Sequence, residues 1–398
     1  TDASISLLDE LLRFVSLGSA LDGVRSIVAT TVIILAIPLY IALGIDRRLP
    51  KRILLPLILF ALSCPLVTML YPPLIDSRTF TILMSLTQLL LCLPPYLQIR
   101  RIGGRFLRLP REMFSHPFFR LRNTLVFGGI NLALSPLALL LVAVAIVNAY
   151  LYVSTAGFMR IGPTGIQMTE KVYRDGEKSI RLVGMIHVGE REFYDRLVSS
   201  VSTGRTVILA EGVTDDRRML TNSFSYRNVA GVLGLTSQET MRFKGRHVGD
   251  GDEEPPANDT GGQLPDIVSA DLDMSSFTPT TIRFMNELGK QLHDASSAMD
   301  GLLAFNGWAS RNITPQMQET IRNDILHRRN LSVIRHLDRN LDRYDTIVIP
   351  WGALHMPEIE QAIIKRGFTV TEQQERVSVS FVRLFSPAKV RGHEKSGR

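Results

Sequence analysis

Four long uncharged stretches dominate the pattern of apolar and polar positions in the first part of the chain. They contain no Asp, Glu, Lys or Arg and cover residues 27–45, 53–71, 80–99 and 124–153. A helix needs about 20 apolar residues to cross a bilayer, and its backbone must satisfy its own hydrogen bonds there. The pattern therefore predicts an α-helical membrane anchor with four spans over residues 27–154. The preceding segment, 1–26, is amphipathic, and its apolar spacing over 5–21 suits a helix at the membrane interface.

From residue 155 onward, short apolar runs alternate with amphipathic ones. Two alternating runs, 166–173 and 179–186, flank Asp175-Gly176, which is a strong signal for a β-hairpin. Further strands are expected at 206–210, 266–270, 345–350, 368–371 and 377–385, with helices at 191–201, 280–292, 315–341 and 357–365. Strands that alternate with helices predict an α/β domain, 155–386, with a mixed sheet covered by helices.

Two segments of this second part have no periodicity. Residues 245–264 are rich in Gly, Asp and Pro, which is typical of a flexible surface insertion. Residues 387–398 are polar and basic, and we expect them to form a disordered tail. The two cysteines, Cys64 and Cys92, both lie in apolar runs, which excludes a disulfide framework and a cysteine-rich zinc module.

The charge of the chain is informative only once it is located. A net charge of +7 invites a nucleic-acid function, but two short loops, 46–52 and 100–122, carry eleven basic residues against two acidic ones. These loops have a net charge of +9 and the remainder is slightly acidic, so no nucleic-acid partner is expected. The positive-inside rule places both loops in the cytoplasm. We therefore expect a multi-pass protein of the cell membrane whose C-terminal domain lies outside the cytoplasm.

Polar residues that can bind a ligand follow four of the predicted strands. His187, Glu211, Asp271 and His355 each come just after an apolar run. Sites in open α/β sheets form outside the carboxyl ends of the strands, so these side chains are expected to meet. Imidazoles with carboxylates are typical ligands of a hydrolytic metal ion. We expect the four residues to hold a divalent ion (Mn, Co, Zn or Fe), with Glu211 also able to act as a base.

The two histidine positions share a local motif. Residues 184–190 and 352–358 both read G-x-x-H-x-x-E, and each follows an apolar strand and precedes a helix. We interpret Glu190 and Glu358 as helix-capping residues. The remaining histidines lack such a context and are interpreted as surface or packing residues: His116, His247, His293, His327, His336 and His393. The chain contains no G-x-S-x-G, no phosphate-binding glycine loop and no H-E-x-x-H.

The paired motifs resemble the TraB/PrgY/GumN/Tiki family, which is related to the erythromycin-esterase and ChaN-like proteins. The resemblance covers about residues 160–385 and none of the membrane anchor. It rests on GMIHVGEREFYDRL at 184–197, ILAEGV at 208–213, HRRN at 327–330 and IPWGALHMPEIEQAIIKRGF at 349–368. The chain differs from many relatives because its spans precede the domain, and because Met356-Pro357-Glu358 stands where the family often has a glycine.

The resemblance implies an erythromycin-esterase/ChaN-like fold and several activities. Tiki proteins are membrane-tethered, metal-dependent proteases with an extracellular catalytic domain, the related esterase uses His and Glu without metal, and ChaN-like members bind haem iron. Carried over to this chain, His187, Glu211 and His355 become metal ligands or acid/base groups, and Arg329 becomes an oxyanion stabiliser.

The sequence thus predicts a membrane-anchored, metal-dependent peptidase that acts on peptides or proteins outside the cytoplasm. Its partners would be the lipid bilayer, the substrate and, in a homo-oligomer, further copies of the chain. Two alternatives stay open. One is a non-enzymatic module of the same fold that binds a peptide, haem or a partner protein, and the other is a metal-independent esterase.

Overall fold

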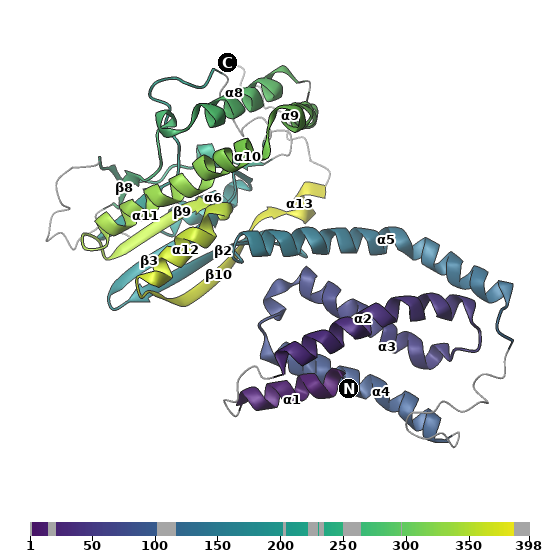
Figure 1. Cartoon of the computed structure of the whole chain (residues 1–398). Coiled ribbons are helices and arrows are strands. Elements are labelled where there is room, and N and C mark those ends of the chain that lie inside the picture. The colour runs from purple at the N-terminus through teal and green to yellow at the C-terminus, as the bar shows by residue number, and fades with distance from the viewer. Residues whose placement is uncertain are drawn as a thin grey trace, which may run out of the picture. The chain divides into compact units, whose positions relative to one another are not determined.

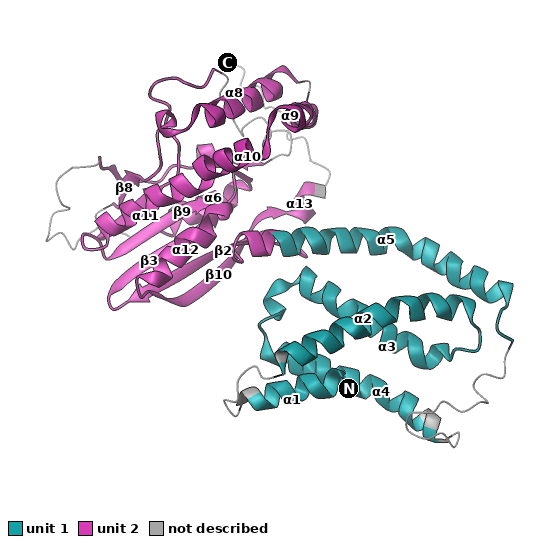
Figure 2. Ribbon diagram, in the orientation of Figure 1, with its two compact units in different colours: residues 1–150 teal, residues 151–398 magenta. Residues whose placement is uncertain are grey.

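The computed structural model forms two compact units, Thr1–Tyr150 and Leu151–Arg398 (Figure 2). The residues that it describes are 2–14, 21–101, 117–201, 204–221, 230, 235–249, 264–295 and 297–385. The predicted disordered tail, 387–398, and most of the predicted insertion, 250–263, lie outside the described residues.

Among the described residues, four helices are long and apolar enough to cross a membrane, which confirms the prediction of a multi-pass membrane protein. They are α2 (Asp22–Ile45), α3 (Lys51–Leu70), α4 (Arg78–Arg101) and α5 (Leu121–Ser154) (Figure 1). A short 3-10 helix, η1 (Pro72–Leu74), precedes α4. All four long helices continue through internal prolines.

Polar side chains connect the long helices within the first unit. The Asn148 side-chain amide donates to the carbonyl oxygens of Met69, at 3.1 Å, and Leu70, at 2.9 Å. The Tyr40 hydroxyl donates to Asn131 Oδ1 at 2.7 Å. Such bonds join α2 and α3 to α5, where apolar packing alone would give little specificity between helices surrounded by lipid.

The N-terminal helix α1 (Asp2–Phe14) buries two acidic side chains within the first unit. Asp9 and Glu10 are buried, and Arg25 of α2 lies 3.5 and 3.6 Å from their carboxylates. Leu8 and Leu11, by contrast, are 50% and 57% exposed. Arg25 thus supplies a counter-charge for the buried carboxylates. An interfacial helix places its apolar side in the lipid, so the interfacial position of this segment stays a prediction.

The second unit is built on a mixed sheet, as predicted, and the described residues contribute eight strands to it. Its strands run in the order β1 (Met159–Gly162), β2 (Gly165–Asp175), β3 (Lys178–Met185), β9 (Thr346–Gly352), β5 (Thr206–Ala210), β8 (Asp266–Ser269) and β7 (Arg246–His247), and β10 (Thr369–Ser380) pairs with the other edge of β2. The strands β3, β9, β5, β8 and β7 are parallel to one another, whereas β1, β3 and β10 are each antiparallel to β2. The pair β4 (Val188–Gly189) and β6 (Thr236–Ser237) forms a separate small sheet.

Helices cover both faces of the sheet (Figure 1). Because side chains alternate along a strand, Ile347 and Ile349 of β9 pack with α11 (Arg329–Asn340) and α12 (Met356–Lys365). The residue between them, Val348, packs with α6 (Arg191–Ser199) on the opposite face. The central strands are therefore buried on both sides, which explains their nearly continuous apolar runs.

The remaining helices lie between strands in the chain, except for α13, which follows the last described strand. They are η3 (Gln238–Thr240), η4 (Met274–Ser276), α8 (Pro279–Asp294), α9 (Ala298–Asn312), α10 (Pro315–Arg322), the π-helical η5 (Asn323–Arg328), η6 (Ala353–His355) and α13 (Phe381–Phe385).

Two local predictions were wrong. The strands expected at 368–371 and 377–385 are one strand, β10, that ends at Ser380, and the last five residues form α13. The helix expected at 315–341 is present as α10, η5 and α11, which follow one another without a gap, and its middle part, η5, is π-helical. The insertion expected at 245–264 begins with the strand β7, which pairs with β8.

Candidate functional site

Four parallel strands bring the predicted polar residues to one edge of the sheet. The strands β3, β9, β5 and β8 are neighbours and point the same way, so their carboxyl ends share this edge. His187 follows β3, Glu211 follows β5, Asp271 follows β8, and His355 ends the turn η6 that follows β9. Arg329 reaches the same edge from the first residue of α11.

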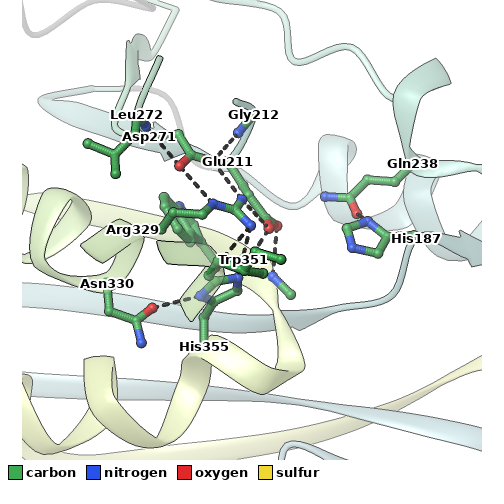
Figure 3. Close-up of polar contacts among 12 residues, drawn as sticks. His187, Glu211, Gly212, Gln238, Asp271, Leu272, Arg329, Asn330, Trp351 and His355 are labelled. Atoms are coloured by element: carbon green, nitrogen blue, oxygen red, sulfur yellow. Dashed lines mark hydrogen bonds and ion pairs between the residues drawn. The ribbon is translucent and has the colours of Figure 1, made fainter. Parts of the chain in front are cut away.

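Arg329 lies at the centre of a buried network of charged groups (Figure 3). Its Nε and Nη2 donate to the two oxygens of Asp271 at 2.9 and 2.6 Å, and Nη2 also donates to Glu211 Oε1 at 2.9 Å. Burial opposes the charge of Arg329, but the bonds to Asp271 and the charges of Asp271 and Glu211 raise its pKa above the ordinary value. The guanidinium therefore stays charged, and its two hydrogen bonds to Asp271 fix its orientation.

The backbone holds both carboxylates in place. The amide of Gly352 donates to Glu211 Oε2 at 2.8 Å. The amides of Gly212 and Leu272 donate to Asp271 at 3.0 and 2.8 Å. Each carboxylate therefore has two kinds of partner, a backbone N–H and the guanidinium, which offset the cost of its burial.

His355 is the second buried member of the network, with 4% of its surface exposed. Its Nδ1 lies 2.7 Å from Asn330 Oδ1, and its Nε2 lies 3.3 Å from Arg329 Nη1 and 3.6 Å from Glu211 Oε1. The ring of Trp351 meets the imidazole edge-on, with 5.2 Å between the ring centres. Burial, followed by the charge of Arg329, lowers the pKa of His355 to about 4. His355 is therefore neutral near pH 7.

His187 lies apart from this network (Figure 3). Its side chain is exposed, and its Nδ1 lies 3.0 Å from Oε1 of Gln238. His187 nevertheless lines the same pocket as Glu211 and Arg329, which has a volume of about 520 Å³. The histidine and the guanidinium thus face a shared space in which a substrate could lie between them.

The glycines of the two G-x-x-H motifs serve different purposes. A Cβ atom at Gly184 would lie 3.2 Å from the carbonyl oxygens of Phe158 and Thr169, so this glycine allows close packing of backbones. A Cβ atom at Gly352 would lie 3.5 Å from Glu211 Oε1, which is an ordinary contact. The two motifs therefore share a sequence pattern, but their glycines lie in different surroundings.

The glutamates of the motifs do not cap their helices with their side chains, so our capping interpretation was wrong. Glu190 accepts hydrogen bonds from the Ser380 amide at 2.9 Å and from Arg383 at 3.0 Å. Glu358 accepts a hydrogen bond from Asn330 Nδ2 at 2.6 Å, and its other oxygen lies 2.6 Å from His327 Nδ1.

The arrangement does not fit the expected divalent metal ion. Over the residues that the structure describes, no three His, Cys, Asp or Glu side chains form a group that could hold one. Among the expected ligands, Glu211 and Asp271 both bind the guanidinium of Arg329, and His187 pairs with another residue. A cation is thus already placed between the two carboxylates, and the fourth expected ligand, His355, faces that same cation.

Sequence reasoning did not find the roles of Asn330, Glu358, His327 and Gln238. Three of them lie near the motifs: Asn330 and His327 flank Arg329, and Glu358 follows His355 by one helical turn. Each of these three lies within one helical turn of an expected site residue, and this spacing was the signal that could have found them. Gln238 reaches His187 only because β6 pairs with β4, and nothing in its own sequence context indicated this.

Comparison of the chain with models of known protein families, with curated proteins and with solved structures finds no match. The resemblance to the TraB/PrgY/GumN/Tiki family therefore stays a prediction that rests on the motifs.

Proposed function

We propose that the protein is a membrane-anchored hydrolase that cleaves carboxylic esters or amides outside the cytoplasm without a metal ion. The observation that carries the proposal is the pocket shared by His187, which is exposed, and Arg329, which stays charged. A general base and a fixed cation on two sides of one space are the parts that acyl transfer to water requires.

His187 has the hydrogen-bond partner that a general base needs. Its Nδ1 contacts the side-chain oxygen of Gln238, which can only accept, so Nδ1 carries the proton. Nε2 is then the nitrogen that carries the lone pair, and we propose that it accepts a proton from the attacking water. In the proposed histidine–amide pair, the amide of Gln238 fixes which histidine nitrogen is basic. Catalytic bases in other enzymes are oriented by a neighbouring group in the same way.

The proposed reaction proceeds in two proton transfers. His187 Nε2 takes a proton from water while the water oxygen bonds to the carbonyl carbon of the substrate. The carbonyl oxygen becomes negatively charged and is stabilised by the positive charge of Arg329, which lines the same pocket. The bond to the leaving oxygen or nitrogen then breaks, and protonated His187 returns the proton to that atom.

The pocket walls favour a substrate with a large apolar group. Met241, Phe243, Met274 and Met285 line the pocket together with the polar residues of the site. Methionine side chains are flexible and adapt to ligands of different shape. We therefore infer that the group next to the cleaved carbonyl is an alkyl chain or a large apolar side chain, such as those found in acyl esters and peptides.

The proposed location outside the cytoplasm is supported by the charge of the loops between the spans. The basic loops 46–52 and 100–122 would both lie in the cytoplasm. Because α5 follows the second of these loops and leads directly to β1, the second unit would begin on the opposite side of the membrane.

The test is hydrolysis by the purified full chain in detergent or lipid discs. We would use p-nitrophenyl esters of increasing acyl length and a library of short peptides. His187→Ala should reduce kcat by about 100-fold or more, because general-base catalysis contributes about 10²–10⁴-fold. His293→Ala, at the exposed end of α8, is the matched control and should leave kcat unchanged. Equal turnover by the His187→Ala variant and the control would exclude the proposed base.

One observation favours a second function, binding without turnover. The bonds of Arg329 to Glu211 and Asp271 satisfy these three side chains within the protein. Such a closed network would suit a rigid pocket floor beneath an apolar ligand. Tight binding of an apolar ester that is never cleaved, in the full chain and in His187→Ala alike, would support this function instead.

A further inference from the structure

A chain of polar side chains leads from His355 to the protein surface. His355 Nδ1 contacts Asn330 Oδ1 at 2.7 Å, Asn330 Nδ2 donates to Glu358 Oε2 at 2.6 Å, and Glu358 Oε1 lies 2.6 Å from His327 Nδ1. His355 and Asn330 are buried, whereas His327 is about half exposed. The chain joins α11, η5 and α12 on the side of His355 that faces away from Arg329.

The directions of these hydrogen bonds follow from the chemistry of the groups. An ionised carboxylate can only accept, so the Asn330 amide must turn its NH₂ toward Glu358. Its oxygen then faces His355 and can also only accept. His355 must therefore carry its proton on Nδ1 and its lone pair on Nε2.

The other side of the ring gives an independent argument for the same tautomer. Arg329 Nη1 lies 3.3 Å from His355 Nε2, and a guanidinium N–H can only donate. A proton on Nε2 would point at this donor, and it would also approach Glu211 Oε1, which lies 3.6 Å away. The Nδ1–H tautomer accepts from Arg329 and leaves Glu211 paired with the guanidinium.

We propose that Asn330 and Glu358 are positioning residues, which fix His355 as the Nδ1–H tautomer and thereby hold Arg329 in its place beside the pocket. This inference rests on the proposed function only for its effect on catalysis, because the tautomer is a property of the resting protein. The histidine of the second motif thus acts through Arg329, and the base is the histidine of the first motif.

The histidines of the two G-x-x-H-x-x-E motifs are supported by different residues, and the position of Glu358 explains this difference. In the second motif the glutamate lies in the first turn of α12 and supports the histidine through Asn330. In the first motif Glu190 binds the amide of Ser380 and Arg383. His187 is instead supported by Gln238, from outside its motif.

The test is the ¹⁵N chemical shifts of the His355 side chain in the full chain, with ¹⁵N-labelled histidine at a pH where His355 is neutral. The signal is assigned by its loss in His355→Gln. We expect a protonated-type shift at Nδ1 and an unprotonated-type shift at Nε2. Asn330→Leu should abolish this preference, because leucine cannot accept a hydrogen bond from Nδ1–H.

Two matched controls separate positioning from general loss of structure. Asn340→Leu removes another buried amide of α11, which donates to the His336 carbonyl at 2.7 Å, and it should leave the His355 shifts unchanged. Glu360→Gln, which alters a carboxylate of α12 bound to Lys171 and Tyr173, should do the same. Glu358→Gln should weaken the preference, because its amide group no longer forces the orientation of Asn330.

The second measurement is the steady-state kinetics of ester hydrolysis, in which we expect kcat to change and KM to stay the same. Loss of an outer supporting group typically costs 10–100-fold in activity, so Asn330→Leu should lower kcat by about 10-fold. A proton on Nε2 in the unaltered protein would overturn the inference, even if the protein cleaves esters. The expected shifts without any turnover would support the inference and contradict the proposed function.

Discussion

Arg329 pairs with Asp271 and Glu211 in surroundings where an unpaired charge would be costly. Its side chain is 12% exposed, and those of Asp271 and Glu211 are 0% and 5% exposed. The contribution of such a network to stability is modest when complete, but removal of one partner leaves a buried charge without compensation. A substitution that removes one charge from the network without changing the size of the side chain should therefore lower the stability of the protein.

Asp271→Asn should lower the free energy of unfolding by about 3 kcal/mol, because it leaves the guanidinium with only part of its counter-charge. Both tryptophans, Trp308 and Trp351, belong to the second unit, so urea unfolding followed by tryptophan fluorescence measures this unit within the full chain. Asp216→Asn is the matched control at an exposed position of the adjoining loop and should change little. Equal stability of both variants would show that the network is not coupled to folding.

The buried imidazole of His355 should make stability depend on pH. Its pKa falls to about 4 in the folded protein, mainly through burial, whereas an unfolded chain has the ordinary value of about 6.5. The unfolded state therefore binds more protons between these values, so stability is fully present above about pH 6.5 and is lost as the pH falls toward 4. The loss from this residue is on the order of 3 kcal/mol. His355→Gln should flatten the unfolding free energy over this window, and an unchanged pH slope would contradict the assignment.

Among the structural elements, those with a strong local signal were predictable from the sequence. Asp175-Gly176 predicted the β2–β3 hairpin, and the apolar runs that became β5 and β9 were found because both of their faces are buried. The strand β10 was split in two because it is an edge strand with exposed polar residues at its centre, such as Gln373 and Gln374. The helix α9 was missed because its exposed positions include Leu302 and Leu303, which obscure its polar face.

The candidate site was predictable as a set of strand-end residues, but not as a network. The sequence indicated that His187, Glu211, Asp271 and His355 would reach one edge of the sheet. It could not show that Arg329 would pair with both carboxylates, because pairing depends on side-chain distances across three elements. For the same reason it could not show that His187 would point to another partner.

The pairing of β2 with β10 depends on the absence of a side chain at Gly165. A Cβ atom there would lie 1.9 Å from the carbonyl oxygen of Val379, so the backbones could not keep their distance. Gly165→Ala should lower the free energy of unfolding by about 2 kcal/mol, as is usual for overpacking. Gly307→Ala, in the α9 helix with its nearest atom 3.9 Å away, should be neutral or slightly stabilising. Equal effects of the two substitutions in urea unfolding would contradict this account of the strand pair.

For the whole molecule, the central question is on which side of the membrane the second unit lies. A phosphatase reporter fused after Arg398 should be active, because that enzyme requires an extracytoplasmic environment, and a fluorescent reporter that matures only in the cytosol should stay dark. Replacement of the basic residues of loop 46–52 by neutral ones should weaken this preference, since Lys and Arg in short loops set orientation. A reporter active only in the cytosol would invert the topology and place the pocket inside the cell.

The measurement that tests the central claim most directly is ester hydrolysis by the full chain after exhaustive treatment with a chelator, with elemental analysis of the same sample. The account predicts that turnover persists in protein free of divalent metal and falls by about 100-fold or more in His187→Ala. Loss of turnover on chelation, with recovery on addition of Mn²⁺, Co²⁺, Zn²⁺ or Fe²⁺, would contradict it and restore the metal-dependent peptidase that the sequence first indicated.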